Sequence, residues 1–111
     1  GVVSPAELRA LLEHELERAK STLAYCRREV RAEERRVAAE AARYADAVTA
    51  ACAVFGETVP DAVEDVLDRL RPHRSTFNAM QASETEARVE QLVEALRCFD
   101  AAVGPNAEAA A

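Results

Sequence analysis

The stretch YADAVTAACAVFGETVPDAVEDVLDRL, residues 44–70, decides the fold because a helical pattern runs through it past two helix breakers, Gly56 and Pro60. Apolar residues recur at every third or fourth position and therefore fall on one face of a helix. They are Val48, Cys52, Phe55, Val59, Val63, Val66 and Leu70. A Pro inside a helix removes a backbone donor and crowds the preceding turn, so it kinks or ends the helix. Because the stripe keeps its phase, we expect one helix over about residues 41–71, kinked at Pro60.

The composition is typical of an all-α protein. Half of the 111 residues are hydrophobic, many of them Ala, and the chain has only 3 Gly, 4 Pro and no Trp. Runs of Val, Ile, Thr and aromatic residues that would indicate strands are missing. A chain of this length can bury a single hydrophobic core without metals or disulfides. We therefore predict one helical domain over residues 1–111.

Two further helices are indicated on either side of this stretch. Ser4-Pro5-Ala6-Glu7 combines an N-cap Ser, a Pro at the first helical position and a capping-box Glu, so a first helix should cover about residues 4–37. Its apolar seam is broken only at Glu33; the seam residues are Leu8, Leu12, Leu16, Ala19, Leu23, Cys26, Val30 and Val37. A third helix should cover about residues 75–103, ending at Gly104-Pro105 before a tail over residues 104–111. Its seam is Ala82, Thr85, Val89, Leu92, Leu96, Phe99 and Val103.

The Ala-rich segment near residues 38–44 leaves two alternatives open. It contains no Gly, Pro, Asn or Ser, so local propensity favours a single helix from Ser4 to Phe55, roughly 75 Å long at 1.5 Å per residue. A turn hidden in this segment would instead give three matched helices that bury their stripes against one another. We predict the second arrangement, an antiparallel three-helix bundle.

The charge of the chain excludes some partners. A net charge of −6 and a pI near 5.0 do not suit binding to nucleic acid or to anionic membranes, which both require a basic surface. No run of 18 apolar residues and no signal-peptide pattern is present in this sequence. We therefore expect a cytoplasmic protein without a membrane partner.

No pattern of catalytic or metal-binding residues is visible. The two histidines, His14 and His73, lie far apart and belong to no metal-binding motif. The three cysteines, Cys26, Cys52 and Cys98, lack CxxC spacing and are interpreted as small buried thiols. We expect no enzymatic activity, no cofactor and no metal.

Three short elements resemble the tubulin-binding cofactor A family. Tyr25-Cys26-Arg27-Arg28-Glu29, leading to Glu33-Glu34-Arg35, is similar to a Tyr followed by a charged run in the first helix of that family. Val59-Pro60-Asp61 is similar to the kink in its second helix, and Tyr44-Ala45-Asp46 to the Tyr-Asp element that opens this helix. The order of the elements agrees over most of residues 17–103. The polar, Gly-containing loop of the family is replaced here by the Ala-rich segment.

The resemblance implies a small three-helix chaperone that holds β-tubulin without ATP or covalent chemistry, in the cytoplasm and associated with the cytoskeleton. The candidate contact residues are Arg27, Arg28, Glu33, Glu34, Asp61, Glu64 and Asp65. A monomer is expected. The alternative is a dimeric coiled-coil adaptor or assembly subunit, in which one helix from Ser4 to Phe55 dimerises and residues 60–103 fold back on its C-terminal half. The dimer seam of this alternative is Leu12, Leu16, Leu23, Val30 and Val37.

Overall fold

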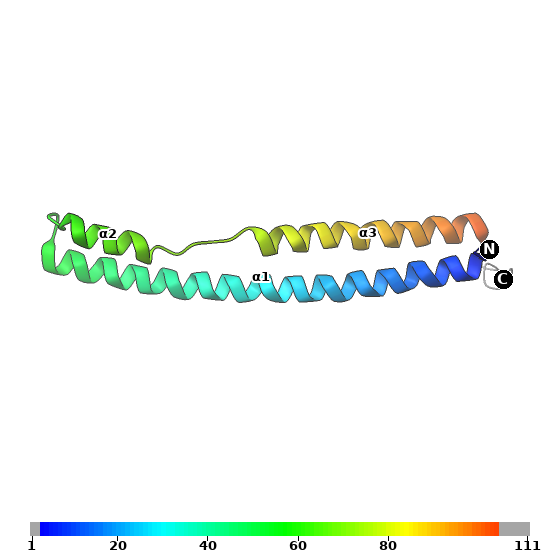
Figure 1. Cartoon of the computed structure of the whole chain (residues 1–111), viewed down its shortest axis with the longest axis horizontal. Helices are drawn as coiled ribbons and strands as arrows, with labels where there is room; N and C mark the ends of the chain where they lie inside the picture. The colour runs from blue at the N-terminus through cyan, green and yellow to red at the C-terminus, as the bar shows by residue number, and fades with distance from the viewer. Residues whose placement is uncertain (1–2, 105–111) are drawn as a thin grey trace. The chain divides into compact units, whose positions relative to one another are not determined.

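The protein is all-helical over the residues that the structure, a computed structural model, describes, which are residues 3–104 (Figure 1). Its helices are α1 (Pro5–Phe55, 51 residues), α2 (Asp61–Leu70, 10 residues) and α3 (Phe77–Val103, 27 residues). The described residues contain no strand. The predicted all-α class is confirmed, and α1 packs against α3 as in a helical bundle.

Helix α1 begins where the sequence predicts. The N–H of Glu7 donates to Oγ of Ser4 at 3.2 Å, and the N–H of Ser4 donates to Oε2 of Glu7 at 3.4 Å. The two side chains thereby satisfy backbone donors that the first turn of a helix leaves without partners.

The predicted turn near residues 38–44 is wrong, because α1 continues through this segment to Phe55. The predicted helices over about 4–37 and about 41–71 are therefore wrong as well. Ala has the highest helix propensity, and nothing in the segment competes with the helical hydrogen bonds. The seam also continues through the segment and beyond it at its three- and four-residue spacing. Its partly buried positions there are Val37, Glu40, Tyr44, Ala47 and Ala51.

The predicted kink at Pro60 is in fact a break between two helices. Gly56 has a φ of +64°, and its N–H donates to the carbonyl of Cys52 at 2.8 Å, which closes α1 with a left-handed residue. Pro60 has φ −63° and ψ 148°, so it is extended and stands directly before α2. Its carbonyl accepts the N–H groups of Val63 and Glu64 at 2.9 and 3.0 Å.

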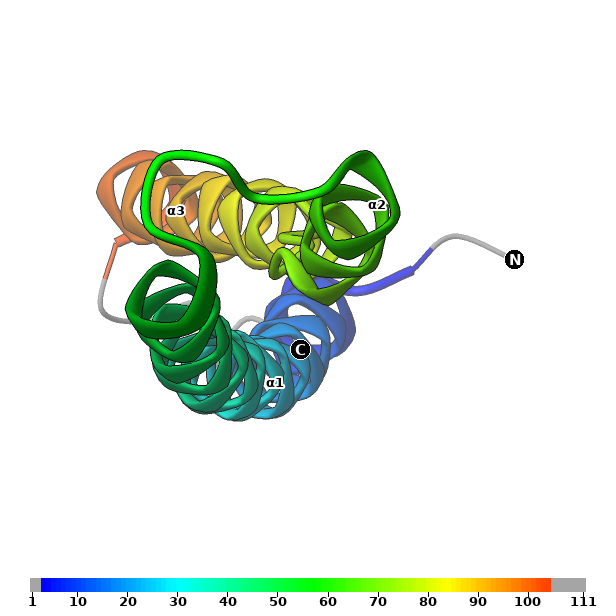
Figure 2. The same ribbon diagram turned by 90° about the vertical axis from the view of Figure 1, so that its left-hand side faces the viewer.

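The predicted apolar stripe is only partly buried on the two sides of this break. Helix α2 lies beside the C-terminal part of α1 (Figures 1 and 2). Val48 of α1, Val59 before α2, and Val63 and Leu67 of α2 are partly buried. Val66 and Leu70 of the predicted stripe are about half exposed, at 50% and 48%.

By their contacts the described residues form two compact units. Residues up to Arg28 and those from Phe77 onward form the first, and Glu29–Thr76 forms the second. Helix α1 runs through both units. The single domain expected over residues 1–111 stays a prediction, and most of the tail expected over residues 104–111 lies outside the described residues.

The core lies in the first unit. Leu16 and Ala19 of α1 pack with Leu92 of α3, and Leu12, Val89 and Leu96 pack around them. The α3 seam is confirmed from Ala82 to Phe99, whose seam positions are all buried or partly buried, whereas Val103 is exposed. The N–H of Gly104 donates to the carbonyl of Asp100 at 2.8 Å and ends α3 as predicted.

The intramolecular core contradicts two details of the coiled-coil alternative. Leu12 and Leu16, expected to face a second copy, are packed against α3 of their own chain. Helix α3 also packs on the N-terminal part of α1, whereas the alternative placed residues 60–103 on the C-terminal half. The single long helix of that alternative is nevertheless present.

Candidate functional site

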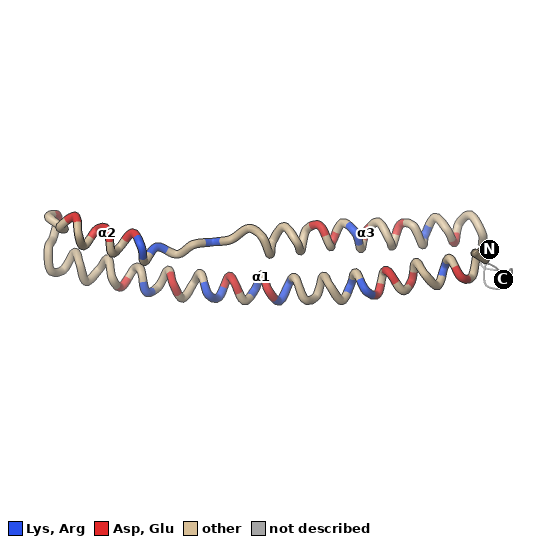
Figure 3. Tube along the Cα trace, in the orientation of Figure 1, with Lys and Arg blue, Asp and Glu red and all other residues tan. Residues whose placement is uncertain are grey.

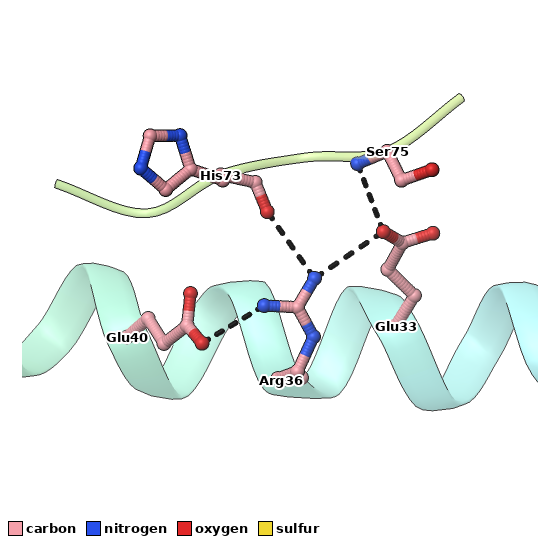
Figure 4. A network of polar contacts seen from close by, with 5 residues as sticks. All are labelled: Glu33, Arg36, Glu40, His73 and Ser75. Atoms are coloured by element: carbon pink, nitrogen blue, oxygen red, sulfur yellow. Dashed lines mark hydrogen bonds and ion pairs between the residues drawn. The ribbon is translucent and has the colours of Figure 1, made fainter. Parts of the chain in front are cut away.

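A polar network on α1 holds the extended linker between α2 and α3 (Figure 4). The N–H of Ser75 donates to Oε1 of Glu33 at 2.9 Å. Nη2 of Arg36 donates to the carbonyl of His73 at 3.2 Å and to Glu33 at 3.3 Å. Nη1 of Arg36 donates to Glu40 at 2.8 Å, and this hydrogen bond raises the pKa of Arg36. We refer to Glu33, Arg36 and Glu40 as the linker clasp.

The linker clasp explains why Glu33 interrupts the apolar seam of α1. The chain opposite Glu33 is not a helix but the extended linker, and the Glu33 carboxylate accepts a backbone N–H from it. The Glu33 side chain, only 13% exposed, supplies this acceptor beside the Arg36 guanidinium. Glu40 lies seven residues further along the same face and holds the Arg36 guanidinium.

The predicted partner-binding residues belong to different parts of the chain. Arg27 and Arg28 belong to the first unit, where Arg27 lies 3.8 Å from Glu86. Glu33 belongs to the linker clasp, and its neighbour Glu34 is exposed. The remaining three are exposed residues of α2: Asp61 and Glu64 in its first turn, and Asp65. Acidic groups at this end of a helix interact favourably with its dipole, so a local role accounts for them.

A row of exposed residues on α1 was not predicted as a separate line, and its first member, Leu8, was predicted as a seam residue but is exposed. Leu8, Leu11 and Tyr25 are 44%, 56% and 57% exposed, which is high for large apolar side chains. They belong to a second line with three- and four-residue spacing, beside the seam that packs on α3. We call this line the side stripe; it consists of Leu8, Leu11, Glu15, Arg18, Thr22 and Tyr25. The spacing of the side stripe is present in the sequence, but the seam beside it is more apolar and was therefore interpreted as the only buried face.

The charged middle of the side stripe borders a shallow groove between α1 and α3. The groove has a volume of about 170 Å³ and is lined by Glu15, Arg18, Ala19, Thr22, Thr85 and Arg88. Glu15 accepts from Arg18 at 3.2 Å and lies 3.6 Å from Arg88. The side stripe therefore has apolar ends and a centre that carries both signs of charge.

Further along the first unit, an ion pair joins the beginning of α1 to the end of α3. Nε of Arg9 donates to Oδ1 of Asp100 at 2.9 Å, and this hydrogen bond lowers the pKa of Asp100. Glu15 lies 3.6 Å from Arg88 and Arg27 lies 3.8 Å from Glu86, so two more ion pairs connect these two helices. Early residues of α1 thus contact late residues of α3.

The cysteines were predicted to be buried, and this is confirmed only for Cys26. Cys52 and Cys98 are exposed, and the expectation is wrong for them. Sγ of Cys98 lies 3.4 Å from Oε1 of Glu94. The pKa of Glu94 is lowered to about 2, first by its hydrogen bond to Arg97 and second by that to Cys98.

Within residues 3–104, no three side chains of the metal-ligating kinds come together. None of the described helices is long and apolar enough to cross a membrane. No protein-family model matches the chain, and neither the curated proteins nor the solved structures contain a match. The fold places the chain in the general class of all-α proteins with bundle-like helix packing.

Proposed function

We propose that the chain is a non-catalytic assembly subunit, an antiparallel helical bundle that associates with a second copy of itself through the side stripe. The observation that carries this proposal is the row of Leu8, Leu11 and Tyr25, each about half exposed on one line of α1. Exposed apolar residues that are scattered singly need no explanation, but a line of them along a helix is typical of a protein contact.

The apolar ends of the side stripe can contribute a modest association energy. Full burial of a large apolar side chain contributes about 1.5–3 kcal/mol, so completing the burial of a half-exposed one contributes about 1 kcal/mol. Six such side chains in a dimer contribute roughly 6 kcal/mol, from which the cost of ordering two molecules is subtracted. Hydrogen bonds and ion pairs add to the small remainder, and we expect a weak dimer with Kd on the order of hundreds of micromolar.

The centre of the side stripe suits a second copy of the same chain. In a two-fold symmetric contact the same patch meets itself, so each charged group must find a complementary group on an identical surface. Glu15 provides a carboxylate, and Arg18 and Arg88 provide guanidinium groups on the same groove. The Glu15 of each copy can therefore pair with an arginine of the other, which favours self-association over an unrelated apolar partner.

The substitution Leu11→Glu tests this proposal. It places a charge in the proposed interface at a side chain that is already 56% exposed, so the fold should persist. In sedimentation equilibrium the wild-type mass should rise from 12.1 kDa toward twice that value with concentration. L11E should raise Kd about tenfold or more.

Ala24→Glu is the matched control, because Ala24 is also exposed on α1 but does not belong to the side stripe. It should leave the dimer unchanged. A wild-type protein that remains at 12.1 kDa up to millimolar concentration contradicts the proposal. So does an equal effect of A24E and L11E.

Binding of β-tubulin, which the family resemblance implies, stays a prediction. The resemblance relied on a second helix that opens near Tyr44 and bends at Pro60, and in the structure α1 passes through Tyr44 while Pro60 stands between α1 and α2. Size-exclusion chromatography with β-tubulin released under folding conditions tests it. A discrete complex supports the tubulin hypothesis, and the absence of comigration counts against it.

A further inference from the structure

The second unit contains an open pocket with an unusually basic lining for an acidic protein. The pocket has a volume of about 290 Å³ and is lined by Glu40, Arg43, Arg69, Leu70, Arg71 and His73. These residues come from three segments: α1, the last turn of α2 and the start of the linker. Figure 3 shows basic positions of α1 beside basic positions at the end of α2. Three of the 14 Lys and Arg residues of the chain therefore gather around one pocket.

Two of these arginines have no carboxylate within ion-pair distance in the described part of the chain. Nε of Arg71 donates to Oδ1 of Asp68 at 3.0 Å, and its guanidinium lies 5.4 Å from the centre of the Tyr44 ring. The carboxylate of Glu40 is bound by Arg36 of the linker clasp. Arg43 and Arg69, in contrast, form no ion pair with any residue in the described part of the chain.

The helix dipole accounts for the position of Arg69 but not for that of Arg43. Arg69 lies in the last turn of α2, where a cation interacts favourably with the negative end of the helix dipole. Arg43 lies within α1, twelve residues before its end at Phe55, so no helix terminus attracts it. Both arginines line the same pocket, and two guanidinium groups on one pocket suit an anion with several acceptor oxygens.

We propose that this pocket binds the phosphate group of a small molecule or of a phosphorylated side chain. A phosphomonoester carries between about −1.5 and −2 charges at neutral pH and three acceptor oxygens, which suits two guanidinium groups approaching from two helices. A carboxylate carries one charge and is matched by a single arginine. Leu70 provides an apolar wall for the group that carries the phosphate. The pocket lies in the second unit and the side stripe in the first, so this proposal does not rest on self-association.

The test is a titration of the full chain, labelled with ¹⁵N, observed at the arginine Nε–H resonances. Inorganic phosphate, phosphoserine and glutamate are added separately, at constant ionic strength. Phosphate and phosphoserine should shift the Arg43 and Arg69 resonances saturably, and glutamate should bind more weakly. If phosphoserine binds more tightly than phosphate, the natural ligand is a phosphorylated side chain; if phosphate binds equally or more tightly, free phosphate suffices.

Substitutions at the two arginines make the test specific. Arg43→Gln and Arg69→Gln should each weaken phosphate affinity about tenfold or more, because each removes a charge-assisted contact. Arg35→Gln, at an exposed residue of α1 outside the pocket, should leave the affinity unchanged. All three positions are exposed, and circular dichroism verifies that each variant keeps its helix content. A response that does not saturate, or an equal loss in R35Q, overturns the proposal.

Discussion

Glu33 is a charged residue in an otherwise apolar seam, and its side chain contacts a part of the chain that is distant in sequence. Its carboxylate accepts the N–H of Ser75, 42 positions away in sequence, and lies beside the Arg36 guanidinium. An apolar residue at this seam position would leave the backbone of the linker without its acceptor.

Substitution of Glu33 tests the role of the linker clasp. Glu33→Ala removes the acceptor of the Ser75 N–H, which should reduce the free energy of unfolding by about 1 kcal/mol and accelerate hydrogen exchange at Ser75. Urea unfolding and amide exchange by NMR measure the two effects. The neighbouring exposed residue provides the control, Glu34→Ala, which should change neither quantity. Similar behaviour of E33A and E34A is the outcome that rules out the clasp.

At the scale of single residues, the sequence located Glu33 as an exception but did not explain it. The explanation requires knowing that an extended linker lies opposite, and the linker is far away in sequence. The exposure of Cys52 and Cys98 was missed for a related reason. Helical spacing places a residue near an apolar face, but burial also depends on whether another element covers that part of the face.

At the scale of elements, Gly56 rather than Pro60 determines where the long helix ends. Its φ of +64° lies in the left-handed region, and no other atom would contact an added Cβ there. A side chain at this position would therefore be strained by the backbone conformation and not by crowding.

Gly56→Ala should consequently destabilise the protein by about 1 kcal/mol. Gly56→Asn should cost less, because Asn tolerates the left-handed region better than Ala does. Thermal and urea unfolding, followed by circular dichroism, measure both variants. If G56A is as stable as the wild type, the left-handed cap is not the feature that ends α1.

The helices themselves were largely predictable, but their boundaries were not. The capping box at Ser4, the seam of α3 and its end at Gly104 follow from local chemistry and are found in the structure. The end of the first helix was placed incorrectly because a single helix up to Phe55 was expected to be too long for the rest of the chain to cover. The high helix propensity of the Ala-rich segment nevertheless extends α1 to Phe55. The three- and four-residue spacing of apolar residues is the same in one kinked helix and in two helices joined by a turn, so it could not distinguish them.

At the scale of the whole molecule, α1 is the element on which both units depend. Its N-terminal part packs with α3, and its C-terminal part carries the linker clasp and Arg43 of the basic pocket. The buried core of the described residues is small, consisting of Leu16, Ala19, Leu23, Cys26 and Leu92. All five belong to the first unit. A helical protein with so few buried side chains is suited to gain stability from association, which agrees with the proposed function.

The continuity of α1 is the central claim, and backbone NMR chemical shifts over residues 38–60 test it most directly. The structure predicts helical Cα shifts without interruption through the Ala-rich segment to Phe55, followed by non-helical values from Gly56 to Pro60 and helical values again from Asp61. Non-helical shifts within residues 38–44 together with helical shifts through residues 56–60 would contradict the account, because the three-helix arrangement with a kinked middle helix would then be correct.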